Sequence, residues 1–306
     1  MDARSLAKGP DPLPAYVVAV ALALAWHVWA LGLAWQRGPV PAASNPHRGA
    51  LSAAAPAEGR PGWGYEFRAP ELLDGQTPTL QGLTFTDSNT LLLAAATPAV
   101  TVLYRVDLPT RQLTARAESR EFVHLNSLRT RGNGEVWAAS GVVSRGENII
   151  LRLDLDASFR TGSIVGADLY SFGKAGFSVA FADVDGVEHV FCQQWAPGSG
   201  AEPRLYVFRA NDLRLDALPL KRLDLGRRIQ DIAVSPADGL LYASRNAAQG
   251  ESASRGWLES YDVRAIMAAP DGAAMAPVAR HPHATEAAEG IAFRPDVDLR
   301  PEGRSG

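Results

Sequence analysis

One hydrophobic pattern recurs along most of this chain: two short stretches of alternating apolar and polar residues, separated by a tight-turn sequence. It is clearest in residues 228–246, RIQDIAVSPADGLLYASRN, where residues 235–239 are the turn. Alternation on both sides of a Ser, Pro, Asp and Gly cluster predicts a β-hairpin. The same hairpin pattern occurs at residues 80–95, 125–140 and 177–193, and residues 288–293 repeat its first half.

The spacing of these hairpins predicts how they are assembled. Their starts, at Gly82, Ser127, Val179, Asp231 and Gly290, recur at intervals of 45 to 59 residues. After each complete hairpin a third strand and a more polar fourth strand can be recognised. Four strands per repeat at this spacing are typical of a β-propeller. We therefore expect an all-β propeller of about five blades, or six if one blade goes unrecognised, over residues 63–306.

Ring closure sets a further expectation for the two ends of this domain. Residues 289–293 supply only the inner strand of a fifth blade, and an open ring would expose an apolar strand edge. We expect residues 65–73 to provide an outer strand for that blade and so to join the two ends of the domain.

The chain before the propeller has a different composition. Residues 15–35 contain no Asp, Glu, Lys or Arg, and as a helix they would extend about 31 Å, the thickness of a bilayer core. We predict a transmembrane signal-anchor there, between an N-terminal tail at 1–14 and a Pro- and Ala-rich linker at 36–62. A cleavable signal peptide is the alternative, but its apolar region would normally be shorter.

The flanking charges set the predicted orientation. Arg4 and Lys8 precede the apolar segment, while Arg37 and Arg48 follow it, so the positive-inside rule slightly favours a cytoplasmic N-terminus. We accordingly expect a single-pass protein of the bacterial inner membrane, with the propeller on the periplasmic, extracytoplasmic side.

Composition limits the partners of the propeller. The 306 residues are 46% apolar and 21% charged, with a net charge of −3. The chain therefore lacks the excess of basic residues that would predict a nucleic-acid-binding surface. The single cysteine, Cys192, excludes an intrachain disulfide. Its position within an apolar strand predicts a buried, unreactive thiol.

Candidate chemistry lies where the inner strands begin, because these strands line the central channel of a propeller. The residues that enter the five inner strands are all polar, and the second strand of each hairpin ends at the same rim. These entry residues are Gln81, Asn126, Ser178, Gln230 and Glu289. Carboxylate and amide oxygens there could bind a hard cation or a small polar ligand. The alternative is that they merely hydrate a water-filled channel. The predicted ligand-binding rim comprises Gln81, Asn126, Gln230, Asp231, Glu289, Trp195 and Arg245.

Two of the blade sequences carry a family resemblance. Residues 231–244, DIAVSPADGLLYAS, and 289–293, EGIAF, resemble the calcium-dependent propellers of the gluconolactonase, senescence-marker and strictosidine-synthase-like group. They are also similar to NHL-type propellers and to the membrane-anchored SdiA-regulated family. In the lactonase group, rim carboxylates and amides hold a divalent metal, which here implies a calcium site formed by Glu289, Asn126 and Asp231.

The same resemblance leaves two functions open. Gln81 and Ser178 stand where a complete cage of oxygen ligands would prefer stronger ligands, which argues against lactonase activity. We therefore expect a membrane-anchored module that binds a small molecule or a protein partner at the propeller rim. The alternative is a lactonase- or esterase-like hydrolase, in which a divalent cation polarises a carbonyl and activates water.

Overall fold

The part of the chain that can be described is the predicted propeller domain. The computed structural model describes residues 51–54, 64–67, 78–173, 176–194, 204–246, 256–283 and 290–293. The chain divides into two units, residues 1–46 and 47–306, and every described residue belongs to the second. The predicted tail, membrane span and most of the linker lie outside the described residues. Within the described ranges, no helix has both the length and the apolar character that a membrane crossing requires.

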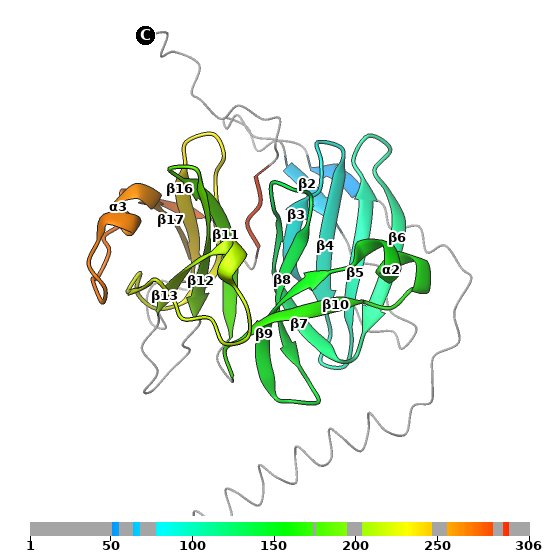
Figure 1. Cartoon of the computed structure of the whole chain (residues 1–306). Helices are drawn as coiled ribbons and strands as arrows, with labels where there is room; N and C mark the ends of the chain where they lie inside the picture. Colours follow the sequence, from blue (N-terminus) through cyan, green and yellow to red (C-terminus); the bar gives the residue numbers. More distant parts are fainter. Residues whose placement is uncertain are drawn as a thin grey trace, which may run out of the picture. The chain divides into compact units, whose positions relative to one another are not determined.

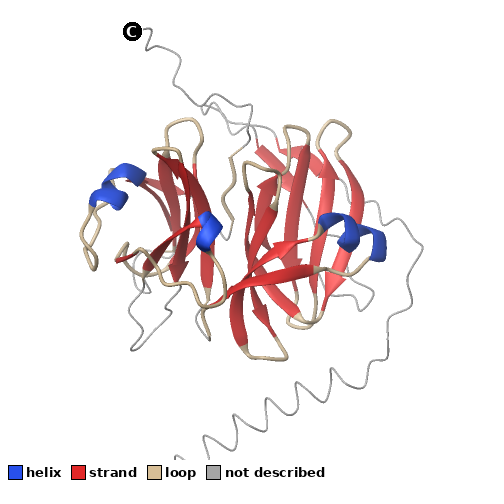
Figure 2. Ribbon diagram, in the orientation of Figure 1, coloured by secondary structure: helices blue, strands red, loops and turns tan. Residues whose placement is uncertain are grey.

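Four antiparallel sheets of four strands each form the domain, and the first strand of each sheet contacts the first strand of the next (Figures 1 and 2). This is the architecture of a β-propeller, as the repeat predicted. The described residues contain four complete blades, where about five were expected. The blades are β3–β6 (Thr79–Phe85, Thr90–Ala96, Thr101–Asp107, Gln112–Ser119), β7–β10 (Phe122–Thr130, Val136–Val142, Glu147–Leu153, Gly166–Ser171), β11–β14 (Phe177–Val184, Val187–Gln194, Leu205–Arg209, Lys221–Leu223) and β15–β18 (Ile229–Val234, Leu240–Arg245, Gly256–Asp262, Ala279–His283).

Two further strands lie before the first blade. β1 (Leu51–Ala54) and β2 (Gly64–Phe67) pair with each other in an antiparallel two-stranded sheet. β1 falls within the range predicted as a linker. β2 overlaps the predicted outer strand at 65–73 and pairs with β1; its assignment to the fifth blade stays a prediction. A partner nearby in sequence costs less loop-closure entropy than one at the far end of the domain.

Each hairpin turn has the chemistry that its sequence predicted. In the turn between β11 and β12, Asp185 and Gly186 both have positive φ, 54° and 80°, as a two-residue type I′ turn requires. Asp183 Oδ1 accepts a hydrogen bond from the Gly186 N–H at 2.8 Å. The sequence at 183–186 therefore forms a hairpin turn, as predicted.

The core lies between the blades, because successive side chains of a strand point to opposite faces of its sheet. In β4, Leu92 and Ala94 pack in the cluster shared with the second blade. Leu91 and Leu93 belong to a separate cluster on the other face of the first blade. Cys192 lies in the cluster between the second and third blades; its thiol is fully buried and burial raises its pKa, as expected of an unreactive cysteine.

Three short helical segments interrupt the strand pattern and were not predicted. α2 (Leu155–Thr161) and α3 (Val263–Ala268) each begin after an aspartate whose side chain caps the first turn, and η1 (Ala210–Asp212) is a single 3-10 turn. Asp154 caps α2 and Asp262 caps α3. Helices of six or seven residues are too short to show a hydrophobic period, so only the capping aspartates could have indicated them.

Candidate functional site

Three of the predicted rim residues lie where the pairing of an inner strand with its neighbour is irregular. The pairing of β3 with β4 skips Gln81, that of β15 with β16 skips Gln230, and the pairing of β7 with β8 is interrupted between Val123 and Ser127, around Asn126. Gln81, Gln230 and Asn126 are half-buried. Such bulges re-aim a side chain away from the ladder. The Oε1 atom of Gln81 lies 3.4 Å from Nδ1 of His124. Trp195 and Glu289 lie outside the described residues.

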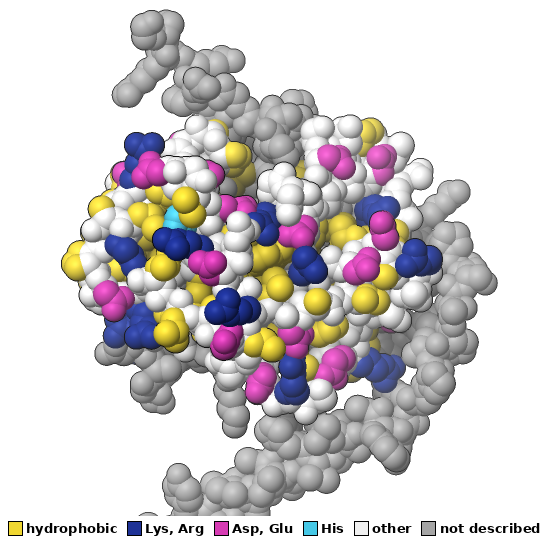
Figure 3. All heavy atoms as spheres, in the orientation of Figure 1, with side chains coloured by type: hydrophobic (Ala, Val, Ile, Leu, Met, Phe, Trp, Pro, Cys, Tyr) yellow, Lys and Arg dark blue, Asp and Glu magenta, His cyan; other side chains and the backbone are white. Residues whose placement is uncertain are grey.

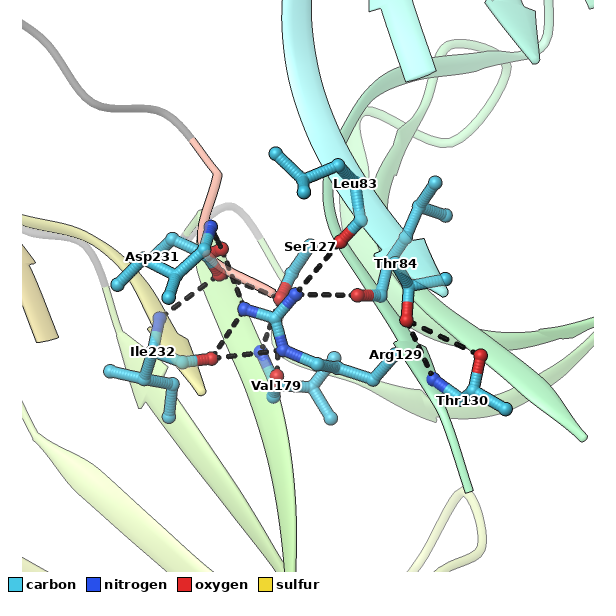
Figure 4. Close-up of polar contacts among 10 residues, drawn as sticks. Leu83, Thr84, Ser127, Arg129, Thr130, Val179, Asp231 and Ile232 are labelled. Atoms are coloured by element: carbon cyan, nitrogen blue, oxygen red, sulfur yellow. Dashed lines mark hydrogen bonds and ion pairs between the residues drawn. The ribbon is translucent and has the colours of Figure 1, made fainter. Parts of the chain in front are cut away.

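Asp231, a predicted rim ligand, is instead fully buried in a network that joins several blades (Figure 4). Its Oδ1 accepts hydrogen bonds from the Ser127 hydroxyl at 2.8 Å and from the Ile232 N–H at 2.9 Å. Its Oδ2 accepts from Arg129 Nη2 at 2.6 Å and from the Ile291 N–H at 2.8 Å. Burial raises the pKa of Asp231, while Arg129 and these hydrogen bonds oppose the rise.

Arg129 is the centre of this network, and its side chain is only 8% exposed. Its Nε donates to the Ile232 carbonyl at 3.1 Å, and its Nη1 donates to the Leu83 carbonyl at 3.4 Å. The guanidinium therefore links the inner strands of the first, second and fourth blades. The sequence analysis did not select Arg129, although a lone arginine within an apolar inner strand was a visible signal.

Of the predicted metal ligands, Asn126 and Asp231 belong to the described residues. Both carboxylate oxygens of Asp231 already accept two hydrogen bonds each, and the adjacent guanidinium of Arg129 would repel a cation. Asp231 thus fits poorly as a metal ligand. Among the described residues, no cluster of three or more His, Cys, Asp or Glu is suited to a metal. The calcium site as a set, which includes Glu289, stays a prediction.

Arg245, also predicted at the rim, acts as a clamp within the fourth blade. Its Nε and Nη2 donate to Glu259 Oε2 at 2.8 and 2.6 Å, and its Nη2 also donates to the Leu225 carbonyl at 2.6 Å. The side chain of Glu259 is completely buried. Burial opposes its ionisation, but hydrogen bonds from Arg245 and Tyr261 outweigh this and lower the pKa of Glu259.

A large cavity of about 1070 Å³ opens at the opposite end of the channel, where the hairpins turn. The final residues of all four inner strands and the turns that follow them line it. Arg129 lies at its base, and α3 and residues 292–293 form part of its wall. The ligand-binding rim predicted from the sequence is at the other end, and this cavity was not predicted.

Five carboxylates line this cavity, and three of them accept hydrogen bonds from backbone N–H groups close by in sequence. Asp183 accepts from Gly186, Asp262 accepts from the first turn of α3, and Asp238 accepts from the Leu240 N–H at 3.0 Å and the Tyr242 hydroxyl at 2.8 Å. Burial opposes ionisation of Asp238, but these hydrogen bonds outweigh it and lower its pKa. Asp185, at the tip of its turn, is exposed.

The remaining charges of the cavity largely compensate one another. Arg131 donates to Glu188 at 2.5 Å and to Asn211 at 2.7 Å, and Arg129 is paired with Asp231. Arg264 on α3 is the other basic lining residue. Three phenylalanines, Phe85, Phe181 and Phe293, complete the wall. The cavity is thus acidic at its turns and aromatic along its wall, whereas on the face shown in Figure 3 acidic and basic side chains are interspersed.

Comparisons with known proteins do not assign this chain to a family. No family model matches the chain, and no curated protein matches its sequence. Among solved structures, it is similar to the Dos1 propeller, with a TM-score of 0.42 and 14% identity over 74% of this chain and 54% of that one. It is also similar to the calcium-binding regucalcin of Agrobacterium tumefaciens, with a TM-score of 0.34 and 13% identity over 67% of this chain and 75% of that one.

A third similar structure is the hydrazine synthase of Kuenenia stuttgartiensis, with a TM-score of 0.38 and 13% identity over 68% of this chain and 50% of that one. The chain spans about half the length of this protein and of the Dos1 propeller. Likenesses at this level carry no argument about function.

Proposed function

We propose that this protein is a ligand-binding propeller that takes an organic cation, an amine or a guanidine, into the cavity at its hairpin turns. The cation belongs to a small molecule or to a basic side chain of a protein partner. The observation that supports this is the combination of five carboxylates, three of them anchored by backbone hydrogen bonds, and three phenylalanines around one cavity of about 1070 Å³. That volume is slightly above the usual range for ligand pockets, about 300–1000 Å³.

Both groups of side chains favour the same ligand chemistry. Carboxylates around a concave site concentrate cations near it, and an ammonium or guanidinium over an aromatic ring gains a further cation–π attraction. The carboxylates of Asp183 and Asp262 are held by hydrogen bonds within their own turns, so little ordering is needed when a ligand binds.

The test compares a cationic probe with its neutral counterpart. Benzylamine and benzyl alcohol are titrated into the purified full chain, with binding followed by calorimetry and by NMR. We expect benzylamine to bind more tightly, and the double variant Asp183→Asn, Asp185→Asn to weaken it about fivefold at low salt, because two nearby charges are lost. Asparagine keeps the turn chemistry. The control is Asp156→Asn, at an exposed position on α2.

Two outcomes would refute this function. Equal affinity for benzylamine and benzyl alcohol would show that charge does not contribute. Unchanged benzylamine affinity in the double variant, with Asp156→Asn as the reference, would show that the cavity is not the binding site. For the hydrolase alternative, no contact within the described residues favours it over binding.

We infer further that the segment at 15–35 anchors the propeller in the bacterial inner membrane, with the cavity on the extracytoplasmic side. The uninterrupted apolar length supports this. Extraction of membranes with alkaline carbonate tests it: an anchored chain stays in the membrane pellet, and release into the supernatant would refute the anchor.

We also infer that residues 290–293 occupy the position of a fifth inner strand. Their contacts reach both neighbouring blades: a Cβ built on Gly290 would lie 2.8 Å from Leu83 Cδ2, and the Ile291 N–H donates to Asp231. The face of the first blade that points away from the second blade is also buried, with Tyr104 at 0% exposure. A ring of five blades accounts for these contacts, and a truncation considered in the Discussion tests it.

A further inference from the structure

A second cavity, of about 480 Å³, lies within the fourth blade, and its chemistry is opposite to that of the first. Its walls come from the loop between β14 and β15, the ends of β16, β17 and β18, and residues 274–277. Four arginines line this cavity, whereas only two carboxylates are near it, Asp224 and the buried Glu259. The lining arginines are Arg227, Arg228, Arg245 and Arg280.

Charge is the first observation that points to a ligand. Four arginines against two carboxylates give this region a net charge of +2, whereas the whole chain carries −3. Asp224 Oδ1 accepts a hydrogen bond from the Gly226 N–H at 2.6 Å, which fixes that carboxylate within its own loop. The excess of guanidinium groups makes the cavity attractive to carboxylate or phosphate oxygens.

The second observation is that the loop bearing two of these arginines is held rigidly. Arg245 donates to the carbonyls of Leu225 and Arg227 and at the same time to Glu259. A Cβ built on Gly226 would lie 3.1 Å from Arg245 Nη1, so glycine allows this close approach. Arg228 has a φ of 67°, which is uncommon for a residue other than glycine. The Arg245 clamp thus presents Arg227 and Arg228 on a loop of fixed conformation.

An aromatic surface adjoins these charges. The guanidinium of Arg280 lies 5.5 Å from the centre of the Trp257 ring and is 2.6 Å from Glu259 Oε1. Trp257, Met275 and Pro277 line the cavity together with the arginines. A planar apolar group could pack on these side chains while its anionic substituent meets the guanidinium groups.

Asn246 provides a further polar contact. Its Oδ1 atom is buried and accepts no hydrogen bond among the described residues, and Asn246 lines this cavity. A buried amide oxygen without a donor is unfavourable by itself, and a hydroxyl or amino group of a ligand would satisfy it.

We propose that this cavity binds a small organic anion, with a carboxylate or phosphate group held by Arg227 and Arg280 and a planar apolar part packed against Trp257. The site is distinct from the acidic cavity at the hairpin turns and prefers ligands of the opposite charge. Arg245 holds the loop through its hydrogen bonds to the carbonyls of Leu225 and Arg227 and is a positioning residue.

The experiment uses the purified full chain and three defined probes: phenyl phosphate, benzoate and inorganic phosphate. Affinities are measured by calorimetry for the parent and for Arg227→Gln, Arg280→Gln and Trp257→Leu. Arg214→Gln is the matched control, because Arg214 is 72% exposed and does not line the cavity. Circular dichroism confirms that each variant is folded.

We expect phenyl phosphate to bind saturably and each arginine variant to weaken it about tenfold, with no change in Arg214→Gln. Trp257→Leu should weaken phenyl phosphate while leaving inorganic phosphate unaffected. Arg227→Gln is the decisive variant, since the clamp uses the backbone carbonyl of Arg227 and not its side chain.

The proposal is wrong if neither phenyl phosphate nor benzoate binds saturably, or if binding survives unchanged in both Arg227→Gln and Arg280→Gln. Benzylamine binding at the other cavity is independent of these variants, so failure here leaves the proposed function standing, and the reverse also holds.

Discussion

At the scale of single residues, the pair of Arg129 and Asp231 joins the inner strands of several blades. A buried ion pair is favourable only where additional hydrogen bonds satisfy its remaining donors and acceptors. Here Asp231 accepts four hydrogen bonds, and Arg129 reaches the carbonyls of Leu83 and Ile232. These hydrogen bonds therefore replace the water that both charged groups lose when they are buried.

Asp231→Asn tests this pair, because it keeps the shape of the side chain and removes its charge. Arg129 would remain buried without a carboxylate, which we expect to lower the free energy of unfolding by about 3–5 kcal/mol. Urea denaturation of the variant and of the exposed control Asp156→Asn measures the difference. A loss of less than about 1 kcal/mol would mean that the surroundings already neutralise Arg129.

This pair also shows what a sequence leaves open at the residue scale. Asp231 stood out as a polar residue at the start of an inner strand, which suggested a ligand of a channel cation. Its actual partner, Arg129, is 102 positions away in sequence. The local sequence pattern cannot identify such a distant partner, because the contact forms only when the ring brings β7 and β15 together.

At the scale of elements, the inner strands of neighbouring blades approach closely at one glycine. A Cβ on Gly82 of β3 would lie 2.6 Å from the Leu125 carbonyl oxygen of β7. Gly82→Ala should therefore lower the free energy of unfolding by about 1–3 kcal/mol, as overpacking of a core does. Gly132→Ala is the matched control, since a Cβ there meets nothing within 4 Å.

Thermal unfolding of the two glycine variants measures this approach directly. A melting temperature that falls for Gly82→Ala and not for Gly132→Ala would agree with the close contact of β3 and β7. Equal melting temperatures would show that the two strands can separate slightly at no cost, so that the first two blades are less tightly packed than the structure indicates.

The hairpins were predictable as elements, and the reason is physical. Alternation places one row of side chains on each face of a sheet, and turn residues such as Asp185 and Gly186 adopt the positive φ that a two-residue turn needs. α2 and α3 were missed because they are inserted between the third and fourth strands with no period of their own. The pairing of β2 with β1 was also missed, because a strand of four residues has too short an alternating pattern to specify its partner or register.

At the scale of the whole molecule, acidic and basic side chains gather in two different cavities, which the overall composition does not reveal. A net charge of −3 gave no indication of an acidic cavity at the hairpin turns and a basic one in the fourth blade. Asp183, Asp185 and Asp238 lie at the turns that follow inner strands, whereas Arg227 and Arg228 lie in the loop that precedes the inner strand β15. The repeat sets this polarity, because every inner strand runs in the same direction along the channel.

Closure of the ring is the remaining property of the whole molecule, and residues 290–293 are central to it. In Figure 1 the segment runs, in red, between the strands of the first and last blades. Ile291 donates to Asp231, and the ring of Phe293 lies 5.2 Å from that of Tyr242. Removing the segment would leave Asp231 Oδ2 with one donor fewer and uncover Leu83.

Two truncations separate this segment from the residues that follow it. A chain ending at 289 should unfold at a lower temperature than a chain ending at 293, because only the second retains the contacts with Asp231, Leu83 and Tyr242. Loss of one buried hydrogen bond costs about 1–3 kcal/mol, and the uncovered apolar surface adds to it. Hydrogen exchange should become faster in β3 and β15, the two strands that the segment contacts. If both chains melt together and exchange alike, the ring is held by its four blades alone and the proposed fifth position contributes nothing to its stability.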